Sequence, residues 1–111
     1  MTALVTRQSK FLLDVCKLVA YATACGYSVT LGEAERTKEQ AAIYAKQGKG
    51  IADSMHLQRL AIDLNFYDAK TGKYVDPNRE NLARLGTFWG SLGRRWGGTF
   101  TTRDDSRHFE E

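Results

Sequence analysis

The sequence predicts an α+β fold in which about three helices pack on a small antiparallel sheet. Apolar residues recur at helical spacing near residues 11–24 and 82–92. They alternate with polar residues near 27–31, 60–66 and 108–110, which is the pattern of half-buried strands. The chain has 111 residues, of which 42% are hydrophobic, enough for the modest core of one small domain.

The N-terminal segment is predicted to be a helix that ends at Gly26. Asp14 and Lys17 interrupt its apolar run, which is too short and too charged for a signal peptide or a membrane span. Cys16 and Cys25 point to opposite sides of such a helix, so we expect reduced packing residues. The residues at helical spacing are Phe11, Leu12, Val15, Val19 and Ala22.

The middle of the chain predicts a strand, a helix and a second strand. Tyr27–Leu31 alternates, and a capping-box pattern at 37–40 opens a predicted helix over 38–47, with Gly48 at its end. The second strand directs Asp63 away from its apolar face, towards a cleft. Its apolar residues are Leu60, Ile62, Leu64 and Phe66.

The last third predicts a hairpin, a helix and a terminal strand. Residues 74–75 are expected to pair back on the preceding strand. Asp76 and Pro77 then resemble the start of a helix, which Gly93 ends. Residues 94–98 are expected to be a loop that leads to a terminal strand. The helix carries an apolar core stripe made of Leu82, Leu85, Trp89 and Leu92.

The two histidines of the chain are His56 and His108. His56 precedes Asp63 by seven residues, which on a continuous helix would separate them by about 10 Å, too far to share one ion. A turn followed by a strand allows the two to approach. Two imidazoles and a carboxylate are a common ligand set for catalytic zinc. Spacing alone leaves open that each histidine is a surface residue and that Asp63 is a strand-edge charge.

A wider pattern resembles the M15 family of zinc peptidases, which includes D-alanyl-D-alanine carboxypeptidases and phage endolysins that cleave L-alanyl-D-glutamate. The first family signature reads Ser-x-His-x-x-Gly-x-Ala-x-Asp, and it is matched here except that Arg59 replaces the glycine. If that glycine needs a positive φ, arginine is strained there. The matching residues are Ser54, His56, Ala61 and Asp63.

The second family signature is an acidic residue, two spacers and a histidine after a Trp-Gly-Gly run. Asp105 and His108 match it, after the run that starts at Trp96. Arg36 and Gln40 match an upstream arginine that is followed by a helix containing glutamine. The resemblance covers the chain from about residue 26 to its end.

The resemblance implies a peptidase fold of the M15 and hedgehog type, with the metal on the open face of the sheet. It implies Zn²⁺ held by His56, Asp63 and His108, with Asp105 as general base. Asp104 and Glu110 are the rival bases, and Glu110 is alternatively a charge at the chain end or a partner of a metal ligand. The resemblance also implies that Arg36 donates a hydrogen bond to the substrate carbonyl oxygen or its oxyanion, and that Ser54 and Gln40 contact the substrate.

The implied activity is hydrolysis of the L-alanyl-D-glutamate bond in the peptidoglycan stem peptide by a phage endolysin-like enzyme. The alternatives are a D-alanyl-D-alanine carboxypeptidase and a zinc-binding but inactive phage structural module. We expect one zinc peptidase domain over 1–111, without a separate wall-binding module, acting as a monomer. It would be made in the host bacterial cytoplasm and reach the wall after membrane permeabilisation, without stable membrane association.

The charge balance argues against a nucleic-acid partner. The net charge is +3 and the pI about 9.0, but 16 basic residues are interleaved with 13 acidic ones. No nucleic-acid-binding motif accompanies them. Mild basicity equally suits an anionic cell wall.

Overall fold

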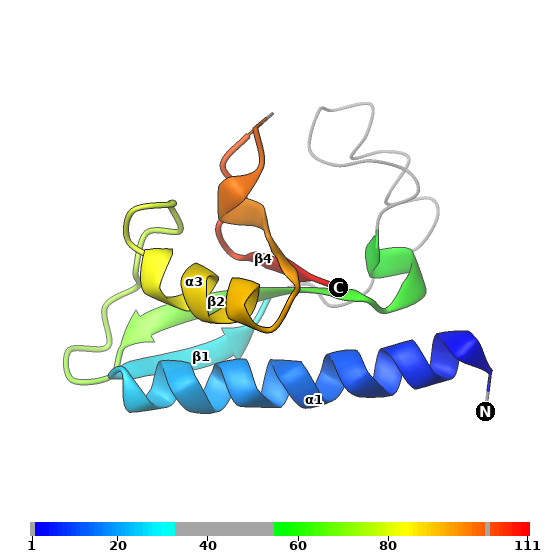
Figure 1. The fold of residues 1–111 in the computed structure, drawn as a ribbon. Helices are drawn as coiled ribbons and strands as arrows, with labels where there is room; N and C mark the ends of the chain where they lie inside the picture. The colour runs from blue at the N-terminus through cyan, green and yellow to red at the C-terminus, as the bar shows by residue number, and fades with distance from the viewer. Residues whose placement is uncertain (1, 33–54, 102) are drawn as a thin grey trace.

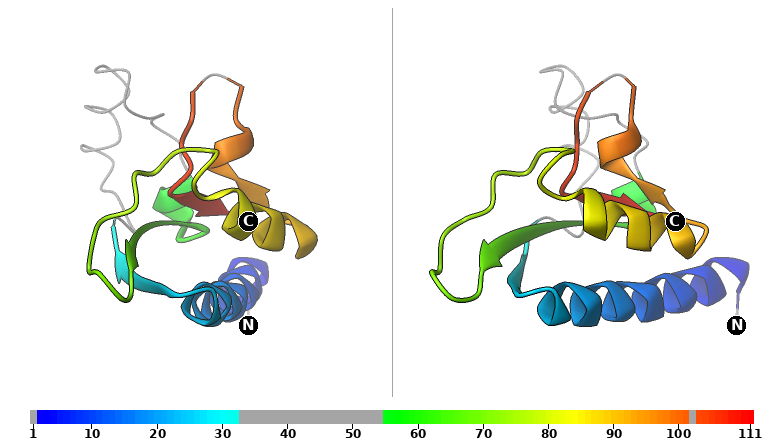
Figure 2. Two further views of the ribbon diagram at one scale, coloured as in Figure 1. Left: turned by 90° about the vertical axis from the view of Figure 1, so that its left-hand side faces the viewer. Right: turned by 60° about the vertical axis from the view of Figure 1, so that its left-hand side comes forward.

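A computed structural model of the chain describes residues 2–32, 55–101 and 103–111. Four strands form one antiparallel sheet in the order β1-β2-β4-β3. Helices α1 and α3 pack on the sheet, and α1 runs along its lower side (Figures 1 and 2). The elements are α1 (Ala3–Ala24), β1 (Tyr27–Leu31), the 3₁₀-helix η1 (Met55–Gln58), β2 (Ala61–Asp68), α3 (Ala83–Ser91), β3 (Arg95–Trp96), the 3₁₀-helix η2 (Gly97–Thr99) and β4 (His108–Glu110).

The predicted α+β class and small antiparallel sheet are confirmed. The described ranges contain two α-helices where the sequence predicted about three. The other predicted helix, at 38–47, lies outside them. No helix within these ranges has the length and apolar character needed to cross a membrane.

Helix α1 begins well before the apolar run that predicted it. The Thr2 hydroxyl accepts a hydrogen bond from the Val5 N–H at 3.1 Å and caps the helix. Gly26 follows its end with φ 95°. Leu12 was expected on the buried face, but it is 60% exposed and Leu18 is buried instead. The side chains of α1 that enter the core are Phe11, Val15, Leu18 and Ala22.

The cysteine prediction is partly wrong. Both thiols are free, as expected, but Cys16 is exposed rather than packed, and Cys25 is half-buried. Cys16 lies between the two buried residues Val15 and Leu18, on the side of α1 that faces away from the core.

The pairing of β1 with β2 follows the alternation in the sequence. Tyr27 pairs with Asp68 and Leu31 with Leu64. The predicted hairpin is present as a bridge between Tyr67 and Tyr74, supported by the Val75 N–H, which donates to the Phe66 carbonyl at 2.9 Å.

Two predicted elements in the last third were wrong in extent. Helix α3 starts at Ala83 rather than at Pro77, because the Asn78 side chain accepts from the Asn81 N–H at 2.8 Å and folds this segment into a turn first. The segment 94–98 was expected to be a loop. Its residues Arg95 and Trp96 instead form β3, and a 3₁₀-helix follows.

The core fixes β4 against both helices. Trp89 of α3 meets Phe11 and Phe109 edge-to-face, each at 5.7 Å between ring centroids. Its indole N–H is shared between the carbonyls of Glu110 at 3.0 Å and Arg95 at 3.1 Å. The strand that carries His108 is therefore held by an aromatic cluster beneath it.

Candidate metal and catalytic site

Asp63 and His108 face each other across the central strand pair. They are direct partners in the β2–β4 register, so their side chains leave the same face of the sheet. The Asp63 Oδ1 lies 3.0 Å from the His108 Nδ1. Both residues are buried, with exposed fractions of 7% and 6%. Two of the three proposed metal ligands are thus brought together.

The other ring nitrogen of His108 meets a second carboxylate. His108 Nε2 lies 2.7 Å from Glu110 Oε1. Glu110 is 7% exposed and forms an ion pair with Arg95 of β3. It is therefore a buried partner of His108, not an exposed charge at the chain end.

The charges around His108 favour its protonated form. Burial lowers the pKa of His108, but hydrogen bonds to Asp63 and Glu110, with the negative charges of Asp63 and Asp105, raise it from 6.5 to about 9. Burial likewise opposes ionisation of Glu110, but His108 and Arg95 hold the pKa of that carboxyl below its usual range. In the metal-free protein these contacts therefore favour the positively charged ring, with a proton on each nitrogen facing a carboxylate.

The turn predicted between His56 and Asp63 is present. His56 belongs to η1, and its side chain falls outside the described part of the structure. Arg59 ends the turn at φ 58°, and it is the one non-glycine residue with positive φ in the described ranges. The Leu60 N–H donates to the Met55 carbonyl at 3.0 Å and closes the turn. Arginine thus occupies a left-handed conformation that favours glycine.

The Trp-Gly-Gly run shapes the approach to Asp105. The Trp96 indole N–H donates to the Ser106 carbonyl at 2.7 Å. A Cβ on Gly98 would overlap the Trp96 ring, and a Cβ on Gly97 would overlap the Asp105 carbonyl oxygen. The Asp105 N–H donates to the Gly97 carbonyl at 3.2 Å. The two glycines therefore allow the backbone next to Asp105 to pack directly on this run.

Asp105 and its neighbour Asp104 have different surroundings. Asp105 Oδ2 lies 4.0 Å from His108 Nδ1, and 26% of the Asp105 side chain is exposed. The Asp104 carboxylate instead accepts from the Arg79 backbone N–H at 2.8 Å and from the Ser106 hydroxyl. Burial opposes ionisation of the Asp104 carboxyl, but these contacts hold its pKa below the usual range. Of these two neighbouring aspartates, Asp105 is thus the one beside His108.

The donor atoms of Asp63 and His108 are of the kinds that zinc binds. Asp63 and His108 supply one oxygen and one nitrogen, and Glu110 holds the far ring nitrogen, as carboxylates do for metal-binding histidines. Within the described ranges no three His, Cys, Asp or Glu residues form a group able to hold a metal. Of the other sequence-predicted residues, Arg36, Gln40 and Ser54 also lie outside those ranges.

A family model described as D-alanyl-D-alanine carboxypeptidase, within the M15 peptidases, matches residues 47–111, more than half of the chain. The chain belongs to the M15 peptidase family. The resemblance drawn from the two signatures is thereby confirmed. No curated protein matches the chain significantly.

The fold of this M15 peptidase is similar to that of the L-Ala D-Glu endopeptidase ChiX from Serratia marcescens. The crystal structure of that enzyme gives a TM-score of 0.66 at 20% sequence identity, over 87% of this chain and 77% of the other. At this identity the likeness establishes the fold.

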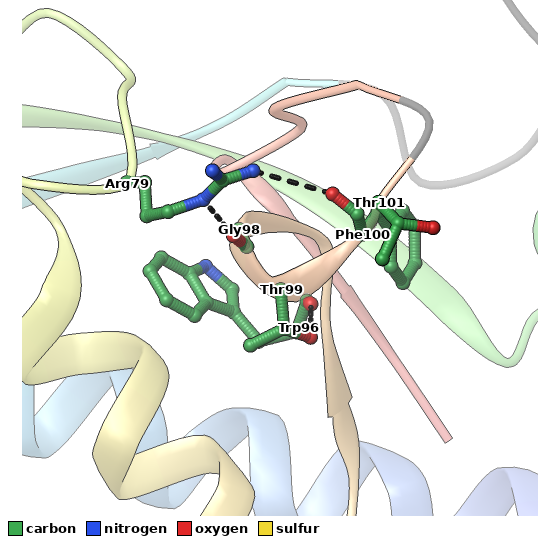
Figure 3. A pocket seen from close by; sticks show the side chains of 6 residues that line it. All are labelled: Arg79, Trp96, Gly98, Thr99, Phe100 and Thr101. Atoms are coloured by element: carbon green, nitrogen blue, oxygen red, sulfur yellow. Dashed lines mark hydrogen bonds between the residues drawn. The ribbon is translucent and has the colours of Figure 1, made fainter.

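Sequence reasoning missed two supports of the site. Gly32, just after β1, donates its N–H to the Asp63 carbonyl at 2.8 Å, and a Cβ there would press on Asp63. Arg79 contacts the loop before Asp105, in a region with no sequence motif. It also borders a pocket of about 450 Å³ (Figure 3). The pocket is lined by Arg79, Trp96, Gly98, Thr99, Phe100 and Thr101.

Proposed function

We propose that this M15 peptidase is a zinc-dependent peptidoglycan hydrolase that cleaves the L-alanyl-D-glutamate bond of the stem peptide. The observation that carries the proposal is the buried Asp63–His108 pair with Glu110 behind it, in a member of a peptidase family. The similar fold of an L-Ala D-Glu endopeptidase supports the choice of bond.

In this proposal His56, Asp63 and His108 would hold the zinc. Bound zinc supplies Lewis-acid polarisation of the scissile carbonyl and acidifies a water molecule. Glu110 fixes the orientation of the His108 ring through Nε2, and the other ring nitrogen, Nδ1, lies beside Asp63.

Asp105 is the proposed general base. Its carboxylate takes a proton from the attacking water and returns it to the leaving amine. Its position beside His108, and the engagement of Asp104 by Arg79 and Ser106, favour Asp105 over its neighbour. Arg36 is the proposed donor to the carbonyl oxygen, and Ser54 and Gln40 are the proposed substrate contacts.

D-alanyl-D-alanine carboxypeptidase activity is the second candidate, because the matching family model carries that description. Both activities act on the same stem peptide, and their products differ. We would digest purified peptidoglycan with the zinc-loaded protein and analyse the muropeptides by mass spectrometry, with Asp105→Ala as the control. New N-terminal D-glutamate supports the endopeptidase. Free D-alanine supports the carboxypeptidase, and an unchanged digest refutes both.

A further inference from the structure

One arginine holds both ends of the loop that leads to Asp105. We define the Asp105 loop as residues 98–101 and 103–105. The Arg79 side chain donates through Nε to the Gly98 carbonyl and through its terminal nitrogen to the Phe100 carbonyl, the latter at 3.2 Å (Figure 3). The Arg79 backbone N–H donates to the Asp104 carboxylate at 2.8 Å. The three contacts span the loop.

The chemistry of these contacts suits a clamp. Gly98 and Phe100 lie within and just after η2, where carbonyl groups at a helix end lack partners within the helix. A guanidinium is a rigid fork that can satisfy two such carbonyls at once, which a lysine ammonium cannot match. Charged donors also make the stronger hydrogen bonds.

The clamped loop bears directly on the proposed metal ligand. The Phe100 ring lies 5.7 Å from the His108 ring, centroid to centroid. The loop continues through Asp104, the third contact of Arg79, to Asp105, whose carboxylate is 4.0 Å from His108. A displaced loop would therefore change where Asp105 sits relative to His108.

We propose that Arg79 is a positioning residue that fixes Asp105 in its working place beside His108. The inference rests on the proposed function, in which Asp105 is the general base. The Arg79 side chain acts through the carbonyls of Gly98 and Phe100, whereas the contact with Asp104 comes from the backbone N–H and remains in any non-proline variant at this position. The alternative role is binding of a substrate anion, since Arg79 also lines the pocket of Figure 3.

Kinetics separate the two roles. Arg79→Ala should lower kcat by about 10- to 100-fold, the cost of a misplacement near 1 Å, while KM and zinc content stay near wild type. Arg79→Lys should be intermediate, because it keeps the charge but lacks the fork. The control is Arg84→Ala, an exposed arginine of α3 beside Cys25, which should match wild type. A raised KM with unchanged kcat, or full activity in Arg79→Lys, would overturn the proposal.

A double variant tests the route through Asp105. If Arg79 acts by placing that carboxylate, adding Arg79→Ala to Asp105→Ala should cause no further loss of kcat, because the two act as one unit. Multiplicative losses would show that Arg79 acts elsewhere.

Hydrogen exchange of the zinc-loaded protein gives a measurement independent of activity. The reporters are three backbone amides of this region. Those of Phe100 and Asp105 both donate to the Gly97 carbonyl, and that of His108 donates to the Asp105 carbonyl. Arg79→Ala should speed their exchange and leave β2 protected, and Arg84→Ala should change neither. Unchanged exchange refutes the clamp even in an active enzyme. A wild-type protein inert on peptidoglycan refutes the proposed function, whereas the exchange result still decides whether Arg79 holds the loop.

Discussion

Asp63 and His108 are direct cross-strand neighbours whose side chains meet at 3.0 Å, between Oδ1 and Nδ1. One lies on β2 and the other on β4, 45 residues apart in sequence. The strand register alone brings them together, so any change that shifts β4 against β2 would separate the two proposed metal ligands.

Zinc binding should depend on pH well above neutrality. The pKa of His108 is raised from 6.5 to about 9, so in the metal-free protein a proton occupies the ring that zinc needs neutral. Zinc affinity should therefore rise steadily as pH increases from 6.5 to about 9. Calorimetry in buffers of different ionisation enthalpy would detect the released proton. A pH-independent affinity over this range would contradict the expectation.

The stability of the metal-free protein should change in the opposite direction. The folded pKa of His108 lies above its unfolded value, so its contribution is fully present below pH 6.5 and is lost as pH rises through about 9. At about 1.4 kcal/mol per pKa unit, the free energy of unfolding should fall by up to about 3 kcal/mol. Urea denaturation with a chelator present measures it. The slope should disappear in His108→Gln.

Glu110 should control the affinity for zinc without binding it. Glu110→Gln keeps the size of the side chain but removes the charge behind His108 Nε2. Loss of such a partner typically weakens metal binding by about 10- to 100-fold. Competition with a chromogenic chelator gives the affinity. The matched control is Glu111→Gln, whose carboxylate pairs with Arg7 at the surface and which should bind zinc like wild type.

Three aspartate variants separate ligand from base. Asp105→Ala should keep zinc but lose about 10²- to 10⁴-fold in rate, the usual contribution of a general base. Asp63→Ala should lose both zinc and activity. Asp104→Ala should keep zinc and lose less activity than Asp105→Ala, because Asp104 contacts Arg79 and Ser106. Metal analysis and muropeptide turnover suffice. An inactive, zinc-loaded Asp104→Ala beside an active Asp105→Ala would reverse the assignment.

Arg59 should carry a backbone cost. At φ 58° a residue with a Cβ is strained by about 1–2 kcal/mol relative to glycine. Arg59→Gly and Arg59→Ala both remove the arginine side chain beyond Cβ. The difference in their free energies of unfolding therefore measures the backbone strain caused by a Cβ at this position. Urea denaturation should find the glycine variant more stable by about 1 kcal/mol. Equal stabilities would show that the turn relaxes when arginine is removed.

The sequence predicted what periodicity and spacing encode. The alternating residues of β1, β2 and β4 predicted these strands, whereas Asp105 and His108 were singled out by their match to the second family signature, and the structure places their side chains 4.0 Å apart. Strand β3 could not be predicted from the sequence, because a segment of two residues, Arg95 and Trp96, is too short to show an alternating pattern. Its extended conformation depends on pairing with β4.

The supports of the site were only partly visible in the sequence. The sequence left Glu110 open as a rival base, an exposed charge or a partner of a metal ligand, and the structure shows it buried beside His108 and paired with Arg95 of β3. Arg79 lies 25 residues before Asp104 and belongs to no pattern, so its contact with the Asp105 loop depends on tertiary structure. The early start of α1 depends on one hydroxyl cap at Thr2.

The placement of the two tryptophans has a spectroscopic consequence. Trp89 is buried in the core, where its ring contacts Phe11 and Phe109. Trp96 instead packs on Gly98 and donates its indole N–H to the carbonyl of Ser106, the residue that follows Asp105. Fluorescence from Trp89 therefore reports global unfolding, and fluorescence from Trp96 reports the surroundings of the proposed base. A Trp89→Phe variant leaves an intrinsic, label-free signal that follows the Asp105 loop in solution.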